Sequence, residues 1–436
     1  MNAPEQGLVE YVEQAAAGIL DACTRCGRCV EVCPVVPYAG LSAASPRTII
    51  DGVLGTVTEN KPLAGDAAKW TQQCNGCGIC IPACPEGVNP RQMVMLAHTR
   101  NMRHNPQTPQ LFRKMSRAIR LMAAMQLAPA DLERLLQPPR VREAEAVFYL
   151  GCNAIRTPHI LFNAMVVLDA LEVDYEVVGG PSACCGIIHS KWEGDLKAGG
   201  KVSSITLQRF GEFQPKKVLN WCPSCEIHLG ETIRGYRETS FDFDHITKYF
   251  VEREDELKAK LITEVPLRVL LHAHEGMAGN GENVARLLRA IPGLTLVDTV
   301  IEAGYTCGGS GADRSPALKE KLRAETLRRV AEPGVDALVS LYHGCHGQLA
   351  TAGRQHGFRV MNFTDLLVRG LGGEPRADAM EGFRALGDWQ AIARRAGPMI
   401  AANGIEIDAE ALAAVLPEVF AQAEFRGGLK SFASSR

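Results

Sequence analysis

Short apolar runs alternate with longer amphipathic stretches from residue 146 onward. The runs AVFYLG, DYEVVG and KVLNW, which begin at residues 146, 174 and 217, have the length and composition of buried strands. Helical stretches lie between them at about 155–171 and 196–211. Strands that alternate with helices in this way predict an α/β unit with a parallel sheet.

The same order of elements recurs further along the chain, which indicates an internal duplication. The strands of the second copy are RVLLHA, LTLVDT and ALVSLY. Single residues show how the two copies align. Cys152 and Cys185 lie 33 positions apart in the first copy, and the matching residues His274 and Cys307 lie 33 positions apart in the second. We therefore predict two copies of one α/β fold.

Two cysteine runs near the N-terminus share the spacing Cys-x2-Cys-x2-Cys-x3-Cys-Pro. This is the spacing of bacterial two-cluster ferredoxins, in which the first three thiolates hold one cubane and the fourth reaches the neighbouring cluster. A pair of zinc knuckles, or one lost cluster, is the alternative, but zinc sites use cysteine pairs rather than runs of four that end in proline. We expect two 4Fe–4S clusters, the first held by Cys23, Cys26, Cys29 and Cys84 and the second by Cys74, Cys77, Cys80 and Cys33.

Five further cysteines follow the ends of the predicted strands in the first α/β copy. Open α/β sheets place their ligand sites at the carboxyl ends of the strands, so these side chains are expected to converge on one point. Glycines beside them supply the tight turns that such a point needs. The five residues are Cys152, Cys184, Cys185, Cys222 and Cys225.

Both cysteine-rich segments resemble known families. The first hundred residues resemble the α-helical ferredoxin domains found in iron–sulfur subunits of succinate dehydrogenase, heterodisulfide reductase and glycolate oxidase. The later pattern, Cys152-x31-Cys184-Cys185-Gly186-x35-Cys222-x2-Cys225, resembles the CCG domain of the heterodisulfide-cleaving subunit of heterodisulfide reductase. That domain is shared by subunits of glycolate oxidase, anaerobic glycerol-3-phosphate dehydrogenase, lactate utilisation and the sulfite reductase membrane complex.

The resemblance to this CCG domain implies a third centre, a non-cubane 4Fe–4S cluster that binds and splits a disulfide. Its ligands would be the five cysteines of the first copy. Five thiolates exceed the four of a plain cubane, which allows bridging or an iron left open to substrate sulfur. An ordinary cubane that only relays electrons, with one cysteine idle, is the alternative, because surroundings that the sequence does not show decide the cluster type.

The second α/β copy keeps only part of the cysteine pattern. Thr306 stands where the first copy has Cys184, and Tyr342 stands where it has Cys222, so a second non-cubane cluster is not expected. Three interpretations remain open: a Cys2His2 zinc site, a substrate pocket with a histidine as proton donor, and an eroded repeat kept for packing. The residues of this tentative site are Cys307, Cys345, His274 and His343, and His272 and His346 near the same strand ends are further candidates, His343 or His346 as the proton donor.

Composition narrows the class of protein. Lys and Arg number 47 against 49 Asp and Glu, so charge gives no reason to expect nucleic acid as a partner. The N-terminus lacks the features of a secretory signal, and the most apolar stretch, 160–168, is far shorter than the roughly 20 residues of a membrane-spanning helix. We expect a cytoplasmic location and no direct membrane span. Fifteen cysteines in that compartment favour metal or redox chemistry over disulfides.

These observations predict an α+β protein of five parts. An α-helical two-cluster ferredoxin domain precedes a duplicated α/β domain of the CCG type with parallel sheets. The expected parts are a ferredoxin domain (1–100), a linker helix (101–145), CCG repeat 1 (146–260), a degenerate CCG repeat 2 (261–370) and a helical C-terminal extension (371–436).

The combined resemblance implies a fused protein of the heterodisulfide reductase type, an oxidoreductase active only within a complex. Electrons would pass through the two cubanes to or from the CCG centre, where a small-molecule or protein-bound thiol or disulfide reacts, as in sulfur metabolism. The rival function is a non-catalytic relay for a flavin-dependent 2-hydroxyacid dehydrogenase of the glycolate or lactate type. The chain has no flavin or nicotinamide fingerprint, so in both cases a partner protein, expected to be a flavoprotein, supplies the two-electron chemistry.

Overall fold

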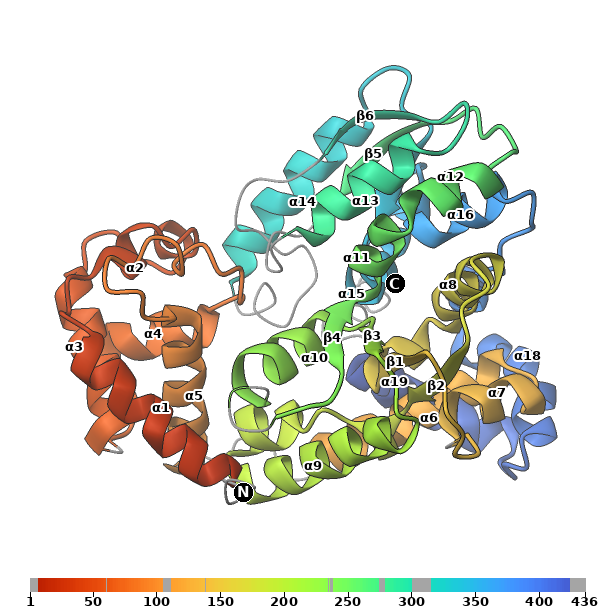
Figure 1. Cartoon of the computed structure of the whole chain (residues 1–436). Coiled ribbons are helices and arrows are strands. Elements are labelled where there is room, and N and C mark those ends of the chain that lie inside the picture. Colours follow the sequence, from red (N-terminus) through yellow and green to blue (C-terminus); the bar gives the residue numbers. More distant parts are fainter. Residues whose placement is uncertain are drawn as a thin grey trace.

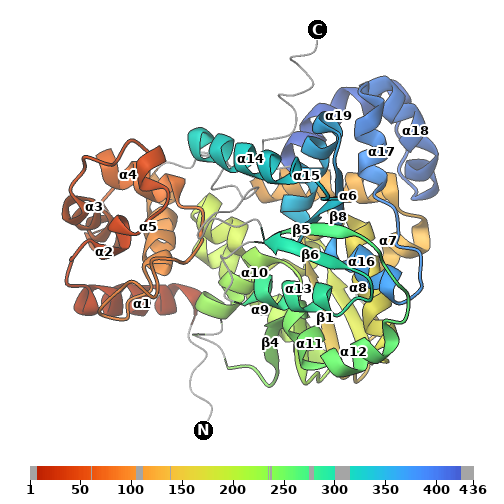
Figure 2. The same ribbon diagram turned by 90° about the horizontal axis from the view of Figure 1, so that it is seen from above.

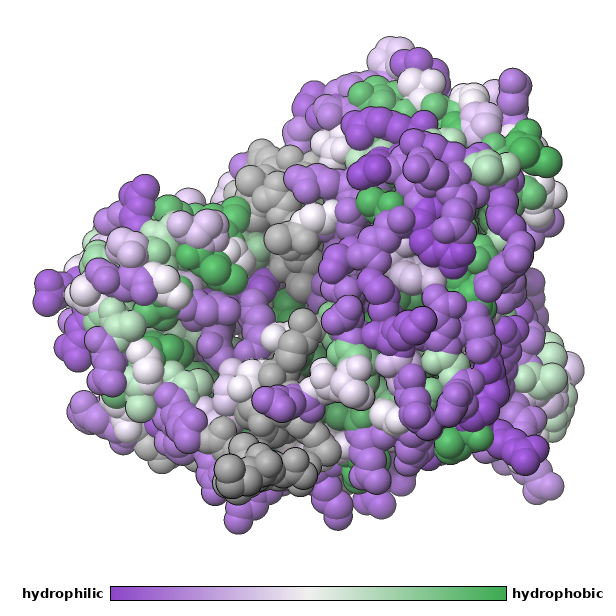
Figure 3. Space-filling model, viewed as in Figure 1, coloured by the Kyte–Doolittle hydropathy of each residue, from purple (hydrophilic) through white to green (hydrophobic). Residues whose placement is uncertain are grey.

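The computed structural model describes residues 7–59, 61–104, 111–137, 139–233, 235, 238–273, 279–299 and 315–423. Its class is α+β, as predicted: a helical N-terminal domain lies beside two parallel four-stranded sheets and their helices (Figure 1, Figure 2). The face of the molecule seen in Figure 3 is largely hydrophilic, with apolar residues scattered over it.

The N-terminal domain consists of short helices around cysteine-rich loops. Its first helix carries Leu8, Val12, Ala16 and Ile19 at helical spacing, and this apolar face is buried. The third and fifth helices begin at prolines, whose fixed φ and missing N–H suit the first helical turn. The helices are α1 (Leu8–Ala22), α2 (Arg28–Glu31), α3 (Pro46–Glu59), α4 (Gly65–Gln73) and α5 (Pro90–His104), with a 3-10 turn η1 at Val36–Tyr38.

The first sheet has the strand order β2-β1-β3-β4, and every pairing in it is parallel. The central strand β1 is buried along its whole length, as expected for a strand covered by helices on both faces. The strands are β1 (Ala146–Gly151), β2 (Tyr175–Gly179), β3 (Lys217–Asn220) and β4 (Asp242–His245). The helices are α8 (Pro158–Ala170), α9 (Leu196–Glu212), α10 (Pro223–Ile227), α11 (Ile246–Glu252) and α12 (Glu254–Lys260), with 3-10 turns η2 (Asn153–Arg156) and η3 (Pro181–Ala183) and π-helical turns η4 (Ile188–Glu193) and η5 (His228–Ile233).

The second sheet repeats this order as β6-β5-β7-β8, again all parallel, which confirms the duplication. The two copies meet through their helices, α8 against α16 and α11 against α13. The strands are β5 (Arg268–His272), β6 (Thr295–Thr299), β7 (Ala337–Ser340) and β8 (Arg359–Asn362). The helices are α13 (Asn280–Arg289), α14 (Pro316–Val330), α15 (His343–His356) and α16 (Phe363–Gly370).

The outer strands β4 and β8 occupy matching positions in the two sheets, and the sequence analysis did not include them. Their sequences, DFDH and RVMN, are short and mix polar with apolar residues. Each ends at a residue whose side chain caps the next helix, His245 before α11 and Asn362 before α16. The capping residue at each strand end was therefore the better signal for these elements.

The segment before the first sheet packs with the C-terminal helices in a second, smaller core. Ala118, Met122 and Met125 of α6 lie in this core, and the helix contacts α18 and α19 (Figure 2). Asn403 ties the two regions together, because its side chain donates to the carbonyl oxygens of Ala124 and Leu127. The elements are α6 (Leu111–Gln126), α7 (Pro129–Leu136), α17 (Ala379–Leu386), α18 (Trp389–Ala402) and α19 (Ala409–Ala423).

Candidate functional site

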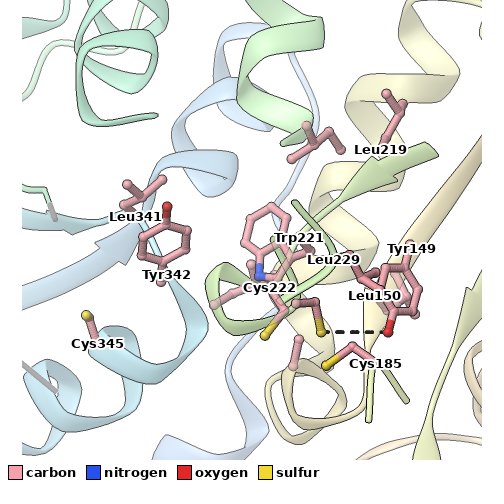
Figure 4. Packing of buried hydrophobic residues seen from close by; sticks show 14 of the residues in the cluster. Tyr149, Leu150, Cys185, Leu219, Trp221, Cys222, Leu229, Leu341, Tyr342 and Cys345 are labelled. Atoms are coloured by element: carbon pink, nitrogen blue, oxygen red, sulfur yellow. Dashed lines mark hydrogen bonds between the residues drawn. The ribbon is translucent and has the colours of Figure 1, made fainter. Parts of the chain in front are cut away.

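Three strand ends of the first sheet deliver cysteines to one buried point. Cys152 follows β1, and Cys222 follows β3 as the residue that precedes α10. Gly151 permits this approach, because a Cβ atom there would lie 3.1 Å from both the Cβ of Cys222 and the Sγ of Cys225, and its φ is +70°. Figure 4 shows Cys185 and Cys222 directed toward the same point.

The five predicted cysteines of the first copy form one continuous group of sulfur atoms. The Sγ atoms of Cys152 and Cys184 are 3.8 Å apart. Side-chain contacts continue from Cys184 to Cys185, then to Cys225 and Cys222. All five residues are buried, with 0–7% of their surface exposed. The structure thus brings together the whole set that the sequence analysis singled out.

Helix α9 fixes the turn that carries the two adjacent cysteines. The hydroxyl of Thr206 donates to the carbonyl oxygen of Cys184 (2.8 Å), and that of Ser203 donates to the carbonyl oxygen of Cys185 (2.7 Å). Gly186 closes the turn with φ +84°, and its N–H donates to the Sγ of Cys184 at 3.4 Å. A Cβ on Gly186 would lie 2.4 Å from a carbonyl oxygen of α9, so no other residue fits.

Contact among the five thiols distributes their protons unequally. Hydrogen bonds from Cys152 and Cys185 hold the pKa of Cys184 well below its usual value, and Cys225 lowers the pKa of Cys222. The hydrogen bond to Cys184 raises the pKa of Cys152 and Cys185, and contacts with Cys185 and Cys222 raise the pKa of Cys225. Several thiolates in one buried pocket need a compensating cation. The donor set therefore fits a metal centre, which would displace the remaining protons.

The ferredoxin-type cysteines fall into two groups. Cys23, Cys26, Cys29 and Cys84 line one cavity. Burial, followed by the charges of Cys23 and Cys26, raises the pKa of Cys29 to about 12. In the other group, Cys33, Cys74, Cys77 and Cys80 influence one another electrostatically, and burial raises the pKa of Cys77 to about 12. The fourth cysteine of each run thus lies with the first three of the other run. Every cysteine in the described part of the chain is a free thiol.

A partly buried ion pair joins the loop of the second cysteine run to the first α/β copy. The guanidinium of Arg91 pairs with the carboxylate of Glu231 in η5, the turn that follows α10 and Cys225. The same guanidinium donates to the carbonyl oxygen of Gly76 at 2.9 Å. One side chain therefore contacts both cysteine-bearing regions. Sequence reasoning missed Arg91 because its partner lies 140 positions away.

Helices α1 and α5 complete this docking. Tyr11 donates from its hydroxyl to the carbonyl oxygen of Glu231 at 3.1 Å. On α5, the ring of His98 lies 3.0 Å from the carbonyl oxygen of Lys191 and packs edge-on against Trp192. The N-terminal domain is thus held at both its first and its last helix, as Figure 1 shows for α1 beside α9.

Two other residues beside the sulfur group were not predicted. Tyr149, on β1, places its hydroxyl 3.7 Å from the Sγ of Cys225 (Figure 4). His228 is buried, its pKa is lowered to about 4 by that burial, and Cys184 acts on it electrostatically. The spacing Cys225-x2-His228 was a usable signal for the histidine, whereas Tyr149 looked like an ordinary strand residue.

The tentative site of the second copy is only partly within the described residues. Cys345 and His343 lie in the first turn of α15 and are buried. His274 and Cys307, like Thr306, lie outside the described residues, so this site stays a prediction. Tyr342, the counterpart of Cys222, has its hydroxyl hydrogen-bonded by Asn280 at 3.0 Å. Its ring packs edge-on against that of His245, with the centroids 5.5 Å apart.

Comparison with known proteins gives the same domains. Residues 19–88 match the 4Fe-4S dicluster domain, and residues 146–230 and 272–350 match the cysteine-rich domain. A subunit of the dihydromethanophenazine:CoB–CoM heterodisulfide reductase of Methanosarcina acetivorans is 24% identical over 377 residues, which are 76% of this chain and 88% of that protein. A subunit of the fumarate reductase (CoM/CoB) of Methanothermobacter marburgensis is 24% identical over 365 residues, which are 80% of this chain and 72% of that protein.

Within the part of the chain that the structure describes, no helix has the length and apolarity needed to cross a bilayer. The domain matches indicate iron–sulfur clusters, and the relatives are subunits of oxidoreductases. The chain joins a 4Fe-4S dicluster domain to a duplicated cysteine-rich domain and is similar, over most of its length, to a subunit of a heterodisulfide reductase and to a subunit of a fumarate reductase (CoM/CoB).

Proposed function

We propose that this chain transfers electrons between a partner protein and a third iron–sulfur centre at which a thiol or disulfide reacts. The observation that carries the proposal is the group of five buried cysteine sulfurs at the strand ends of the first repeat. Similarity to a component of a heterodisulfide reductase supports the reaction class. The direction of electron flow depends on the partner.

The cysteines would divide among three centres. Two 4Fe–4S clusters would occupy the two ferredoxin-type groups, and a non-cubane 4Fe–4S cluster would occupy the group of five. When bound, these clusters supply one-electron transfer along the chain and the two electrons that disulfide cleavage needs. Reduction of a disulfide also consumes two protons and releases two thiols, and His228 and Tyr149 are titratable side chains that lie beside the five sulfurs.

The Arg91–Glu231 pair supports a conducting role for the N-terminal domain. It connects the loop of Cys77 to the turn after Cys225 through one side chain. This connection reaches the second ferredoxin-type group, because Gly76 lies between Cys74 and Cys77. We infer that electrons enter at the first group and leave the second toward the α/β repeats, or take the reverse route.

We propose that the chain works in a multi-subunit complex, in the cytoplasm, with a flavoprotein among its partners. Its substrate would be a small-molecule or protein-bound thiol or disulfide of sulfur metabolism. The second candidate is a relay without substrate chemistry, for a flavin-dependent dehydrogenase of 2-hydroxyacids. The nearly complete burial of the five cysteines favours this second candidate, because a substrate sulfur needs access to the centre.

Spectroscopy of the anaerobically purified full chain separates the two functions. Three clusters predict about 12 irons per chain, and loss of the third predicts about 8. Under the first proposal, adding a thiol during partial oxidation produces a new EPR signal that is absent in Cys185→Ala and present in the control Cys345→Ala. About 12 irons with spectra indifferent to thiols and disulfides would establish the relay. About 8 irons in the wild-type chain would contradict both.

A further inference from the structure

Three side chains from separate parts of the chain converge outside the iron–sulfur sites. They are His159 on α8 of the first repeat, His346 on α15 of the second repeat and Asp378, which precedes α17. One nitrogen of each histidine and one carboxylate oxygen all lie within 4.8 Å of one another. The group therefore joins both repeats to the C-terminal helices.

The imidazole of His159 is buried without a hydrogen-bond partner among the described residues, at either ring nitrogen. Only 2% of the residue is exposed, so water does not satisfy these atoms from outside. Burial lowers its pKa to about 4, so the ring is neutral at pH 7 and keeps one lone pair. A buried polar group that lacks a partner is costly, and it marks a site where an unseen ligand or ion belongs.

The hydrogen bonds of His346 leave a second lone pair pointing at the same place. The hydroxyl of Ser340 donates to the carbonyl oxygen of Met361 and lies 3.0 Å from Nδ1 of His346. With the hydroxyl hydrogen directed to Met361, the Ser340 oxygen can accept a hydrogen from Nδ1, which leaves Nε2 to bind a ligand. Nε2 lies 3.3 Å from Oδ2 of Asp378, so a proton or a metal ion can bridge these two atoms. Orientation of a histidine ligand by a hydrogen bond at its other nitrogen is typical of metal sites.

Asp378 has one oxygen engaged and one available. Its Oδ1 accepts from the N–H groups of Met380 and Glu381 at the start of α17. Its Oδ2 accepts no hydrogen bond from the described residues. A proton shared between Oδ2 and His346 would satisfy that pair, but it would leave His159 without any partner. A metal ion satisfies all three residues.

The donor atoms lie somewhat further apart than the ligands of a bound tetrahedral ion. Metal bonds of 2.0–2.2 Å to nitrogen and oxygen put neighbouring ligand atoms roughly 3.3–3.6 Å apart. The observed separations are 3.3 Å from His346 Nε2 to Asp378 Oδ2 and 3.7 Å from His159 Nδ1 to the other oxygen, Oδ1, and one atom from each residue lies within 4.8 Å of the others. Binding one ion therefore requires side-chain rotations that bring the three donor atoms closer together.

The surrounding charges allow a cation. Arg376 and Arg384 both act on His159, but Arg376 pairs with Asp131 and Arg384 with Glu381. The carboxylate of Asp365, buried close enough to interact with His346 and Asp378, adds negative charge. Arg384 also acts on Asp378, so its charge opposes a cation, whereas the carboxylates of Asp365 and Asp378 favour one.

We propose that His159, His346 and Asp378 bind one Zn²⁺ ion, which fastens the two repeats and the C-terminal helices together. Two imidazoles and a carboxylate are ligands that suit zinc, and a buried site of this kind contributes to folding. The site goes beyond the proposed electron transfer and does not depend on it. It shares only His346 with the candidates for the tentative site of the second repeat, and its other two ligands come from outside that repeat.

Metal analysis of the full chain tests this site. Protein expressed with added Zn²⁺ and purified anaerobically is expected to hold about one zinc per chain, with nitrogen and oxygen ligands at about 2.0–2.2 Å in X-ray absorption spectra. Asp378→Asn keeps the helix cap, because asparagine caps as well as aspartate, and it removes the charged ligand. Asp378→Asn and His159→Asn should lower the zinc content at least fivefold with the iron count unchanged. His356→Gln, at the exposed end of α15, should retain zinc.

Three results would overturn the proposal. The first is a wild-type chain without zinc after incubation with Zn²⁺, and the second is zinc bound through sulfur at about 2.3 Å. The third is full zinc content in both ligand variants. If the variants fail to fold, the wild-type absorption spectrum alone decides, because sulfur and nitrogen or oxygen ligands give different distances. None of these results bears on the iron count, so the electron-transfer proposal is tested separately.

Discussion

The hydroxyl of Tyr149 lies 3.7 Å from the Sγ of Cys225 and 3.0 Å from the carbonyl oxygen of Ala183. The hydroxyl has one hydrogen, so these two acceptors compete for it. A thiolate is the stronger acceptor, so ionisation of Cys225 draws the hydrogen toward sulfur. The direction of the Tyr149 hydrogen bond therefore depends on the charge of the sulfur group.

Replacing Tyr149 with Phe is expected to lower the reduction potential of the third centre. A hydrogen bond to sulfur stabilises the more negative, reduced state, and one to a charged group contributes about 1.5–3 kcal/mol. Only part of this hydrogen-bond free energy differs between the oxidised and reduced states, so we expect the reduction potential to fall by an amount on the order of tens of millivolts. An EPR-monitored redox titration measures it. Tyr175→Phe, on the partly exposed strand β2, should leave the potential unchanged, and an equal shift there would contradict the role of Tyr149.

Gly186→Ala should destroy the turn that carries Cys184 and Cys185. The added Cβ would lie 2.4 Å from the carbonyl oxygen of Gly199, at a φ of +84°. Backbone strain and overpacking together should cost on the order of 3 kcal/mol and remove about 4 irons per chain. Gly211→Ala, in the last turn of the same helix α9 and without close neighbours, is the control and should change stability by less than about 1 kcal/mol. Iron counts and urea unfolding measure the two effects.

Serine variants of the ferredoxin-type cysteines test how the two runs cross. Cys84→Ser should alter the same EPR signal as Cys26→Ser, although the two residues belong to different runs. Cys33→Ser should instead alter the same EPR signal as Cys77→Ser. This follows from the grouping of each fourth cysteine with the other run. If Cys84→Ser altered the signal that Cys77→Ser alters, the assignment of ligands would be wrong.

Arg91→Gln should loosen the docking of the N-terminal domain. It leaves the carboxylate of Glu231 unpaired and half-buried, which costs about 1–3 kcal/mol. We expect faster hydrogen exchange in α1 and η5 and slower reduction of the third centre. The double variant Arg91→Gln with Glu231→Gln should recover part of the loss, because it removes the unpaired charge. Arg25→Gln, whose partner Asp51 is exposed, is the control and should have no such effect.

The buried His245 predicts a loss of stability in acid. Its Nε2–H donates to the carbonyl oxygen of Trp221, and Nδ1 accepts from the N–H of Thr247 at the start of α11. Burial lowers its pKa from 6.5 to about 4, so the unfolded chain takes up the proton first. The neutral ring contributes its full share of the free energy of unfolding above pH 6.5. As the pH falls toward 4, up to about 3 kcal/mol of that free energy is lost. His245→Asn keeps a cap and should flatten this pH dependence in urea unfolding, whereas His356→Gln should not.

The sequence predicted the elements whose signals are local. Strong apolar runs located β1, β2 and β3 and their counterparts in the second sheet within a residue or two. The convergence of Cys152, Cys184 and Cys222 followed from a general rule, because parallel strands end at the same edge of a sheet. The polar strands β4 and β8 lacked an apolar run and were missed.

Contacts between distant segments were not predictable from one sequence. The pairing of Arg91 with Glu231 depends on how two domains dock, and no periodicity encodes it. The meeting of His159, His346 and Asp378 requires the packing of three separate regions; the sequence marked His346 as a candidate ligand, whereas His159 and Asp378 alone look like an ordinary core residue and an ordinary capping residue. The packing of α6 against α18 and α19 likewise appears only in the folded chain.

The contact of α1 with the first repeat depends on two glycines. A Cβ on Gly200 would lie 2.9 Å from the Cβ of Leu8, and a Cβ on Gly235 would lie 2.5 Å from the hydroxyl of Tyr11. So close a fit admits a single orientation of the N-terminal domain. Electron transfer between the centres of this chain therefore requires no movement of the N-terminal domain relative to the first repeat. We expect its rate to be independent of solvent viscosity.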